Sequence, residues 1–369
     1  MARQHEVSIS VGGKKIGGWT EYAIESNMLA PADGFSLARP VNRDAWDLCA
    51  LDSAVTVLID GTPVMTGLID SRQASASAGT MTIAGRDKAG RLVQESAPGI
   101  DYSGLKLREL VKRLASPWFT TVTLSDARNR TIRRGRGYKA PSPTEPLVLD
   151  AVSGGRVEPG QMRWSVIEDL VTQAGYLAWS SSDGKELVIG PPNYRQEIQW
   201  HFVHALDQQG TVLDMVVDQT IADCYSRIIV VGSGRGTDAD YGTGPANRVG
   251  EVLDANGADG IGGDFQRPKR LVLAQDSLRS ADAAQRIARR DANRRNQGRR
   301  KITIEANGHG QIARGSSMTI FAPNTIARCV YDSIGLDAAY LVTSCKFIGK
   351  RTDERTTLEL VPRGTEMTL

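Results

Sequence analysis

The sequence contains few cysteines, and they are widely spaced. Its 369 residues include four, at Cys49, Cys224, Cys329 and Cys345. None belongs to a Cys-x-x-Cys pair, which speaks against zinc and redox sites. Disulfides are not expected in a chain of this size that has no export signal. We therefore predict no metal site and no cofactor.

Long apolar runs are also missing. No window approaches the roughly 18 apolar residues that a membrane-spanning helix needs. The N-terminus, Met1 to Ser10, alternates polar and apolar residues and has no signal-peptide core. We therefore expect a protein that is made in the cytoplasm and either stays there or leaves it inside an assembly.

The net charge is small, and phenylalanine is rare. The formal charge of +3 is small for this length and does not indicate a nucleic-acid binder. The 6 phenylalanines stand against 38 glycines, which favours short strands and tight turns over a large helical core. The length is typical of two or three domains.

The first 95 residues have the pattern of a β domain. Val7, Ile9 and Val11 alternate with polar residues and would share one face of a strand. Asp60-Gly61 separates two apolar runs, which favours a tight hairpin because glycine tolerates positive φ. Since no helical pattern separates these strands, we predict a small barrel or sandwich.

Residues 96–195 combine helices with strands. The first helix is indicated by apolar residues at helical spacing, Leu107, Leu110, Val111 and Leu114. A capping box from Ser165 to Glu168 predicts a second helix over 165–174, ended by Gly175. A hairpin with its turn at Ser182–Gly184 follows. Arg133–Pro146 is rich in Arg, Gly and Pro and is interpreted as a loop.

Strands return after residue 196, most clearly at Arg227–Val231, and again between 301 and 361. Residues 232–266 are rich in Gly and Asp, which predicts a long exposed loop. Gly232–Gly236 follows an apolar strand, as in a dinucleotide site, but Thr237–Pro245 cannot start the required helix. We therefore favour a flexible loop over a nucleotide site.

Catalytic and metal patterns are weak. His201 and His204 would share a face on a helix, but their surroundings look extended and no third ligand is obvious. No spacing reveals a carboxylate pair of the kind that glycosidases use. No serine lies in a Gly-x-Ser-x-Gly elbow. The sequence therefore predicts a protein that is not an enzyme.

A helix predicted over 280–296 buries Ala284, Ile287, Ala288 and Ala292 and carries the densest charge cluster of the chain. The candidate partner-docking residues are Arg286, Arg289, Arg290, Arg294 and Arg295, followed by Arg299 and Arg300. The cluster fits a solvated helix face or a docking face for an acidic protein partner. Nucleic acid is a third reading, although no aromatic residues interleave to stack on bases.

Four stretches, taken together and in this order, resemble a known family. They are Val55–Asp70 with Thr66-Gly67-Leu68-Ile69-Asp70, Thr82–Val93 with Gly85-Arg86-Asp87, Glu158–Tyr176, and Arg267–Pro362 with Ala322–Thr325 and Leu358–Pro362. The chain resembles the Mu-type phage tail proteins that form baseplate hubs and are related to late-control D proteins. Arg163-Trp164 departs from the family pattern, in which Thr or Ser precedes the helix.

The resemblance implies an α+β, mainly β fold with two similar antiparallel β-barrels plus α/β elements, in a ring-forming trimer. The predicted domains are 1–95 (first barrel), 96–195 (α/β domain with two helices), 196–232 with 301–362 (second barrel), 233–300 (inserted loop and Arg-rich helix) and 363–369 (C-terminal tail). Two barrels in each of three copies would present six similar units.

The implied function is a structural baseplate hub of a contractile tail, joining the sixfold tail tube to the threefold central spike. The implied partners are a homotrimer of this chain, the central spike protein, the tail tube protein and other baseplate proteins. Because the chain lacks a needle-like repeat, we expect a separate spike protein. The expected location is the virion tail baseplate, assembled in the bacterial host cytoplasm.

Two other classes remain open. A tail-associated peptidoglycan-degrading enzyme predicts a cleft with a carboxylate pair. A carbohydrate-binding module predicts exposed aromatic residues on one barrel face.

Overall fold

The computed structural model describes residues 5–100, 105, 107–124, 157, 159–173, 176–205, 212–232, 248–254, 264–275, 281–312, 318–350 and 353–363. The chain forms two compact units. The first unit comprises residues 1–216 and 302–364, and the second comprises residues 217–301 and 365–369. Within the described ranges, no helix is long and apolar enough to cross a membrane. The predicted loop Arg133–Pro146, Gly175 and residues 364–369 of the predicted tail lie outside these ranges.

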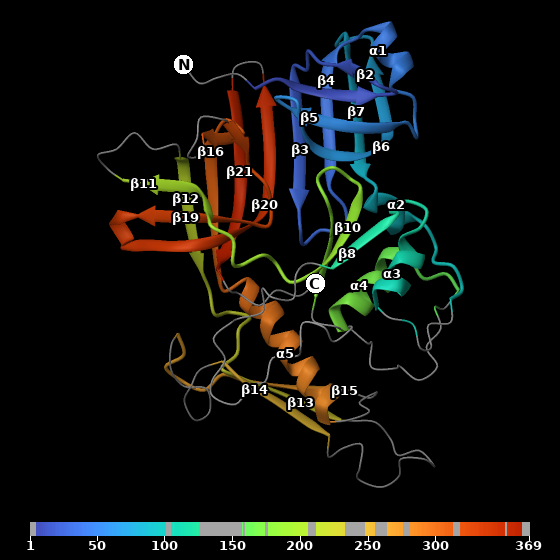
Figure 1. The fold of residues 1–369 in the computed structure, drawn as a ribbon. Helices are drawn as coiled ribbons and strands as arrows, with labels where there is room; N and C mark the ends of the chain where they lie inside the picture. Colours follow the sequence, from blue (N-terminus) through green and yellow to red (C-terminus); the bar gives the residue numbers. More distant parts are fainter. Residues whose placement is uncertain are drawn as a thin grey trace. The chain divides into compact units, whose positions relative to one another are not determined.

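The N-terminal β region of the first unit is built from seven strands with antiparallel pairing (Figure 1). They are β1 (Val7–Val11), β2 (Lys14–Ile16), β3 (Glu21–Asn27), β4 (Gly34–Pro40), β5 (Ala54–Ile59), β6 (Thr62–Ser75) and β7 (Thr80–Asp87). Val7, Ile9 and Val11 are buried, as the alternation predicts. Asp60 and Gly61 both have positive φ, as a two-residue hairpin requires.

Two short helices lie among and after these strands, contrary to the prediction that no helix interrupts the region. They are α1 (Arg43–Leu48) and α2 (Ala89–Gln94). The side chain of Asn42 accepts a hydrogen bond from the backbone N–H of Ala45 at 2.9 Å and so caps α1. A helix of six residues is too short to show a helical period in the sequence.

Strands β6 and β7 carry two glycines at places where neighbouring backbone leaves no room for a Cβ atom. A Cβ on Gly67 would lie 1.9 Å from the carbonyl oxygen of Arg86, and one on Gly85 would lie 2.1 Å from that of Leu68. The pairing register shifts between Ile69 and Ser71, so the strands bend close to these glycines. Both glycines belong to stretches that carry the family resemblance.

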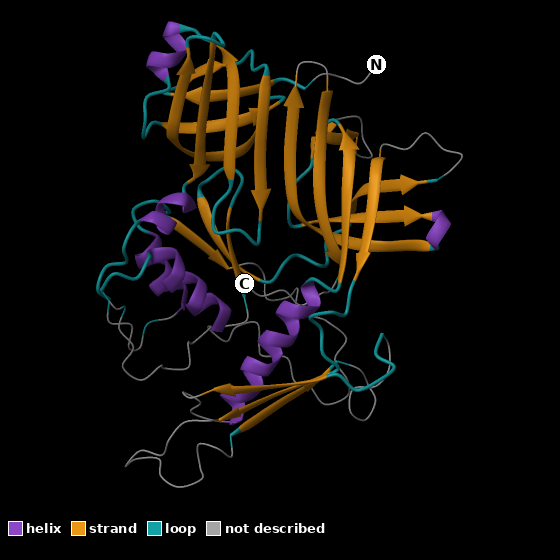
Figure 2. Cartoon of the chain, turned by 180° about the vertical axis from the view of Figure 1, so that it is seen from behind, coloured by secondary structure: helices purple, strands orange, loops and turns teal. Residues whose placement is uncertain are grey.

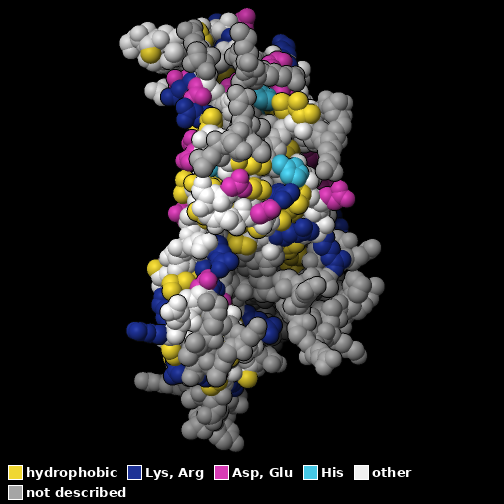
Figure 3. Space-filling view, turned by 90° about the vertical axis from the view of Figure 1, so that its left-hand side faces the viewer, with side chains coloured by type: hydrophobic (Ala, Val, Ile, Leu, Met, Phe, Trp, Pro, Cys, Tyr) yellow, Lys and Arg dark blue, Asp and Glu magenta, His cyan; other side chains and the backbone are white. Residues whose placement is uncertain are grey.

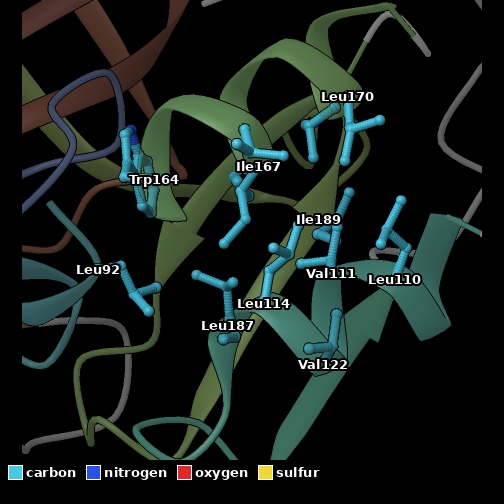
Figure 4. Packing of buried hydrophobic residues seen from close by; sticks show 14 of the residues in the cluster. Leu92, Leu110, Val111, Leu114, Val122, Trp164, Ile167, Leu170, Leu187 and Ile189 are labelled. Carbon is cyan, nitrogen blue, oxygen red and sulfur yellow. The ribbon is translucent and has the colours of Figure 1, made fainter. Parts of the chain in front are cut away.

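The α/β region follows in the same unit. It contains α3 (Leu107–Ala115), β8 (Thr121–Leu124), α4 (Arg163–Gln173), β9 (Leu177–Ser180) and β10 (Glu186–Gly190), with strand order β8-β10-β9. β8 pairs parallel with β10, and β9 pairs antiparallel with it. Leucine, valine and isoleucine side chains from both helices and from the sheet pack into one core (Figure 4). The predicted helix–hairpin unit is confirmed.

Helix α4 begins earlier than predicted. It starts at Arg163, so Ser165 lies inside the first turn, and the predicted capping box is wrong. The guanidinium of Arg163 forms an ion pair with Glu95 at 3.1 Å and donates a hydrogen bond to the carbonyl of Leu114 at 2.9 Å. Trp164 is buried in the core that α3 and α4 share. These tertiary contacts explain why the helix includes the two residues that depart from the family pattern.

The C-terminal β region contributes the remaining strands of the large sheet and one small hairpin. They are β11 (Ile198–His204), β12 (Val212–Gln219), β16 (Arg300–Asn307), β17 (Gly310–Ile312), β18 (Met318–Ile320), β19 (Thr325–Tyr331), β20 (Leu336–Lys350) and β21 (Asp353–Pro362), with the 3-10 turn η4 (Asp332–Ile334) between β19 and β20. β17 and β18 pair only with each other among the described strands. The prediction of strands over 301–361 is confirmed.

The described residues contain one thirteen-stranded sheet in which the two β regions meet. The N-terminal strands lie in the order β3-β4-β7-β6-β5-β1, with β2 as a seventh strand beside β1, and the six C-terminal strands lie in the order β12-β16-β21-β20-β19-β11. The two series join where β3 pairs antiparallel with β20, from Asn27 opposite Ser344 to Glu21 opposite Lys350. Figure 1 shows β3 and β20 side by side at this junction.

A buried polar network links His5, which precedes β1, with Tyr22 on β3, His309 between β16 and β17, and Glu354 on β21. The side chain of His5 contacts Asp60 through Nδ1 at 2.7 Å, and its Nε2 accepts a hydrogen bond from the backbone N–H of His309 at 3.1 Å. His309 contacts the hydroxyl of Tyr22 at 2.6 Å, and Glu354 accepts from the N–H of His5 at 2.9 Å. Burial lowers the pKa of His309 to about 3, so this ring is neutral.

The second unit contains a three-stranded sheet covered by one long helix (Figure 2). It consists of β13 (Arg227–Gly232), β14 (Val249–Leu253), β15 (Arg270–Gln275) and α5 (Ala281–Gln297), with strand order β14-β13-β15. β13 therefore belongs to this sheet, and its assignment to the second barrel within 196–232 is wrong. Its partners are β14 and β15, and it has no described pairing with the large sheet.

The predicted long loop over 232–266 contains a strand. β14 pairs antiparallel with β13 inside that range, while residues 233–247 and 255–263 lie outside the described residues. The strand was missed because Gly250 interrupts its apolar pattern. This glycine is required by packing, since a Cβ there would lie 2.2 Å from the backbone of Ala284 in α5.

Candidate functional site

Helix α5 carries the candidate docking residues, and its buried side is fixed by the second unit's own sheet. Ala284 and Ala288 are fully buried against Val230, as the helical spacing predicts. The side-chain amide of Gln285 forms two hydrogen bonds with the backbone of Glu251. It accepts from the N–H at 2.9 Å and donates to the carbonyl oxygen at 2.6 Å. The helix is thus held on β14 at a fixed rotation about its axis.

Two arginines of the candidate set are used inside the second unit. Arg295 donates to Asp291 at 2.6 Å and to the carbonyl of Asp223 at 3.2 Å, and its guanidinium lies over the ring of Tyr225. The hydrogen bond to Asp291 raises the pKa of Arg295. Arg294 contacts the same Asp291 at 3.2 Å. These contacts stabilise the fold and reduce what the two side chains can offer a partner.

Arg299 and Arg300, just beyond α5, form a second internal cluster. Arg299 donates to Asp254 at 2.6 Å and to Asp264 at 2.9 Å, and it lies over the ring of Phe265. Arg300 donates to Asp264 at 3.1 Å. Burial alone would raise the pKa of Asp264, but the two guanidinium groups outweigh burial and lower it. This cluster holds the end of the helix against Asp254, Asp264 and Phe265.

Arg289 and Arg294 are the members of the candidate set that the structure describes as exposed, and Arg294 is paired with Asp291 whereas Arg289 is not. Within the described residues Arg289 has no hydrogen bond or ion pair. The side chains of Arg286 and Arg290 lie outside the described residues. The docking role of the helix stays a prediction, and Arg289 is now its best-defined representative.

A cavity of about 230 Å³ in the first unit is lined by two acidic residues that sequence spacing did not bring together. Asp33 precedes β4, and Asp87 ends β7. Asp33 accepts from the N–H of Asn27 at 2.7 Å and from the hydroxyl of Ser26 at 2.8 Å, whereas Asp87 accepts from the N–H of Gly90 at 3.2 Å. The pair is visible only once β4 and β7 are adjacent in the sheet.

The electrostatics of this pair follow from burial. Burial raises the pKa of Asp33 to about 6, although the hydrogen bonds from Asn27 and Ser26 act to lower this pKa. Burial and the neighbouring Asp33 raise the pKa of Asp87 well above its usual value. Both carboxyl groups are held by amides of their own turns, which is typical of groups that fix loop geometry.

The weaker sequence candidates do not come together. His201 and His204 lie three apart on strand β11 and therefore point to opposite faces. His204 packs against the ring of Tyr331. The side-chain amide of Gln311 accepts a hydrogen bond from the backbone N–H of His201 and donates one to the carbonyl oxygen of the same residue. Gly232 ends β13, and the rest of the Gly-rich stretch, 233–236, lies outside the described residues.

None of the six tryptophans is exposed. All six are buried or half-buried: Trp19, Trp46, Trp118, Trp164, Trp179 and Trp200. The ring of Trp46 is covered by Arg72, whose guanidinium lies 4.4 Å from its centre, and the indole N–H of Trp200 donates to Thr325 at 2.8 Å. This arrangement offers no exposed tryptophan platform of the kind that a carbohydrate-binding face needs.

Comparison with known proteins identifies relatives along the whole chain. Residues 6–87 match the family model described as Mu phage baseplate assembly protein GpP-like, N-terminal. The chain is 23% identical to the baseplate hub protein gp44 of Escherichia phage Mu, over 97% of this chain and 88% of that protein. The predicted resemblance to the Mu-type baseplate proteins is confirmed.

Two solved structures share the fold over nearly the whole chain. A tail protein from Neisseria meningitidis MC58 matches with a TM-score of 0.76 and 22% identity over 98% of both chains. The 43 kDa tail protein of prophage MuSo2 from Shewanella oneidensis matches with a TM-score of 0.74 and 18% identity, over 98% of this chain and 99% of that one. At these identities the likeness concerns the fold.

Proposed function

We propose that the chain is a structural hub subunit of a phage-type tail baseplate, in which three copies form a ring between the tail tube and the central spike. The observation that carries this proposal is the strand order of the large sheet. Six N-terminal strands and six C-terminal strands lie in corresponding orders, and both series contain one long bulged strand, β6 and β20. Two similar barrels per chain would give six docking units per ring, which match a sixfold tube.

The correspondence has one departure. β1 pairs antiparallel with β5, but its counterpart β11 pairs parallel with β19. The central strands of both series, β4-β7-β6-β5 and β16-β21-β20-β19, pair antiparallel throughout. The proposed duplication therefore rests on the central strands, and a changed outer strand would let the two barrels meet different neighbours.

The ring is tested by measuring the mass of the purified chain with size-exclusion chromatography and light scattering. We expect a trimer, either alone or after co-expression with the spike and tube proteins encoded nearby. A chain that stays monomeric in every combination would reject the hub role.

The docking role of α5 is tested by reversing two charges. Arg289→Glu together with Arg290→Glu should lower the yield of assembled particles while the subunit keeps its circular dichroism and its melting temperature. The matched control is Lys14→Glu with Lys15→Glu on β2, which changes the same number of charges elsewhere. Normal infectious particles from the double arginine variant would reject the docking role.

The cavity with Asp33 and Asp87 is the feature that a peptidoglycan-degrading enzyme would use. We expect no clearing in a peptidoglycan zymogram, because both carboxyl groups are occupied by hydrogen bonds within their own turns. Clearing that disappears in Asp87→Asn would favour the enzyme over the hub.

A further inference from the structure

A chain of four close polar contacts runs through the buried network where the two β regions meet. It begins at the backbone carbonyl of Gly308 and passes through the side chains of Thr356, His309 and Tyr22 to Glu354. All five residues belong to the first unit. The contacts bring β3 of the N-terminal region together with β21 and the turn after β16 of the C-terminal region.

Each of the four contacts is short enough to be a hydrogen bond. The hydroxyl of Thr356 lies 2.7 Å from the carbonyl oxygen of Gly308 and 2.9 Å from Nδ1 of His309. Nε2 of His309 lies 2.6 Å from the hydroxyl of Tyr22, which lies 3.2 Å from Oε1 of Glu354. Because a hydrogen bond needs one proton between its two atoms, the four contacts need four protons.

The three side chains inside the chain of contacts supply only three protons. Thr356 and Tyr22 each have one hydroxyl proton, and a neutral imidazole has one ring proton. Burial lowers the pKa of His309 to about 3, and burial together with the charge of Glu354 raises the pKa of Tyr22. The imidazole is therefore neutral and the phenol keeps its proton. With an ionised Glu354, one of the four contacts has no proton.

The distances indicate which contact lacks the proton. The contact of Tyr22 with His309 is the shortest of the four, and the contact of Tyr22 with Glu354 is the longest. Tyr22 therefore donates to His309, which donates to Thr356, which donates to the carbonyl of Gly308. The phenol oxygen and the carboxylate then face each other with lone pairs alone, which is unfavourable where both groups are shielded from water.

The two oxygens cannot easily move apart, because other contacts hold both of them. A Cβ atom on Gly349 of β20 would lie 2.0 Å from Cζ of Tyr22, so the glycine lets the ring pack directly on the strand. The other carboxylate oxygen of Glu354 accepts a hydrogen bond from the backbone N–H of His5 at 2.9 Å. The open contact is thus part of the fixed geometry of the junction between β3 and β20.

We propose that this network takes up one proton from solvent at the contact of Glu354 with Tyr22, and that the proton tightens the junction between the two β regions. The carboxylate becomes a carboxylic acid, and its O–H donates to the phenol oxygen, so all four contacts have a proton. Glu354 is half-buried and can receive the proton from water. Because the folded state gains a hydrogen bond with this proton, the junction should loosen as pH rises.

The titratable groups that face the contact come from the segments packed around it. Asp60, in the turn between β5 and β6, adds negative charge close to Tyr22 and favours proton uptake. His5 precedes β1, and its Nδ1 contacts Asp60 at 2.7 Å while its Nε2 accepts from the N–H of His309 at 3.1 Å. A proton on Nε2 of His5 would face that N–H and disturb the network. Proton uptake at Glu354 must therefore be measured separately from any effect of His5.

Glu354→Gln supplies the missing proton permanently. Its amide N–H can donate to Tyr22 while its amide oxygen still accepts from the N–H of His5. At about pH 8, hydrogen exchange of the full chain in peptides from β3 and β20 should be roughly three- to tenfold slower in the variant than in the wild type. At about pH 5 the wild type has taken up its own proton, and the two proteins should exchange alike.

The comparison at equal pH removes effects that the two proteins share. Both proteins have the same chemical exchange rates and the same His5. Figure 3 shows acidic and basic side chains interspersed on one face of the molecule, and these groups titrate in both proteins. The matched control is Glu21→Gln, which removes the same charge from an exposed position of β3. It should change the exchange of these peptides by less than about twofold.

Tyr22→Phe removes the oxygen that receives the proposed proton. In this background Glu354→Gln should no longer slow the exchange, because the glutamine amide has lost its acceptor. The four proteins form a double-mutant cycle that isolates the contact between the two side chains.

The outcomes are distinct. A gain at about pH 8 that disappears at about pH 5 and in the Tyr22→Phe background supports the proton site. Equal or faster exchange in Glu354→Gln at the higher pH would overturn it, because the carboxylate would then be neutral to the network or would stabilise it through its charge. A gain that persists at the lower pH or without the phenol oxygen would overturn it as well.

Discussion

Replacing Arg299 by alanine should destabilise the second unit strongly, whereas the exposed Arg289 should be removable at little cost. The side chain of Arg299 is 17% exposed, and its guanidinium bridges Asp254 and Asp264. A hydrogen bond to a charged partner contributes about 1.5–3 kcal/mol when it is well formed. Asp264 is 36% exposed and keeps Arg300 as a partner, so its share is smaller. We therefore expect a loss of about 2–4 kcal/mol.

The matched control is Arg289→Ala, which removes the same side chain from an exposed position of α5. A surface substitution without contacts changes the free energy of unfolding by about 0.5 kcal/mol or less. The two variants therefore separate an arginine that holds the fold from one that is free to meet a partner.

The assay is hydrogen exchange on the full chain, read in peptides from β13 and α5. A loss of about 2–4 kcal/mol corresponds to exchange that is roughly 30- to 1,000-fold faster. Peptides from β4 and β7 in the first unit should be unchanged. The reasoning is refuted if Arg299→Ala exchanges like the wild type, or if Arg289→Ala is equally destabilised.

The remaining predictions concern the first unit. Gly85→Ala should lower the free energy of unfolding by about 2–3 kcal/mol, because its Cβ would lie 2.1 Å from the carbonyl oxygen of Leu68. The control is Gly17→Ala, whose Cβ would have its nearest contact at 3.7 Å and should change this free energy by less than about 0.5 kcal/mol. Equal effects of the two variants in chemical denaturation would contradict the packing argument. The pKa of Asp33 is raised to about 6 from 3.8, so the folded state binds the proton more tightly than the unfolded state. Stability should therefore fall as pH rises from about 4 to 6, by up to about 3 kcal/mol, and Asp33→Asn should flatten this fall; parallel stability–pH curves for the two proteins would rule the carboxyl out as its source.

The sequence predicted the elements whose patterns are local. The strand Val7–Val11 and the hairpin at Asp60-Gly61 were predictable because alternation and positive φ are set by adjacent residues. Helix α5 was predictable because small apolar residues recur at helical spacing, and its burial requires only one sheet face. The hairpin between β9 and β10 was predictable because its turn is also set by adjacent residues.

Features that depend on tertiary contacts were missed. The start of α4 moved to Arg163 because that side chain binds Glu95, 68 positions earlier in the sequence. β14 was hidden by Gly250, whose role is clear only beside α5. Similarly, no spacing links Asp33 with Asp87 or His5 with His309, because strand pairing brings them together.

The roles of the arginines could not be predicted from charge density. Arg289 and Arg299 look alike in the sequence, but the second is surrounded by carboxylates from residues 254 and 264. Charge clusters reveal where cations gather and leave open which of them already have partners within the fold.

The junction between β3 and β20 has a consequence for how the chain emerges from the ribosome. Asn27 meets Ser344, so 317 positions of sequence separate the two strands. At about 5–20 residues per second, β3 would wait roughly 15 to 65 seconds for its partner to be synthesised. During that interval the nascent N-terminal region has an uncovered strand edge, and a chaperone that shields such edges should raise the yield of soluble protein more than it does for proteins with local contacts.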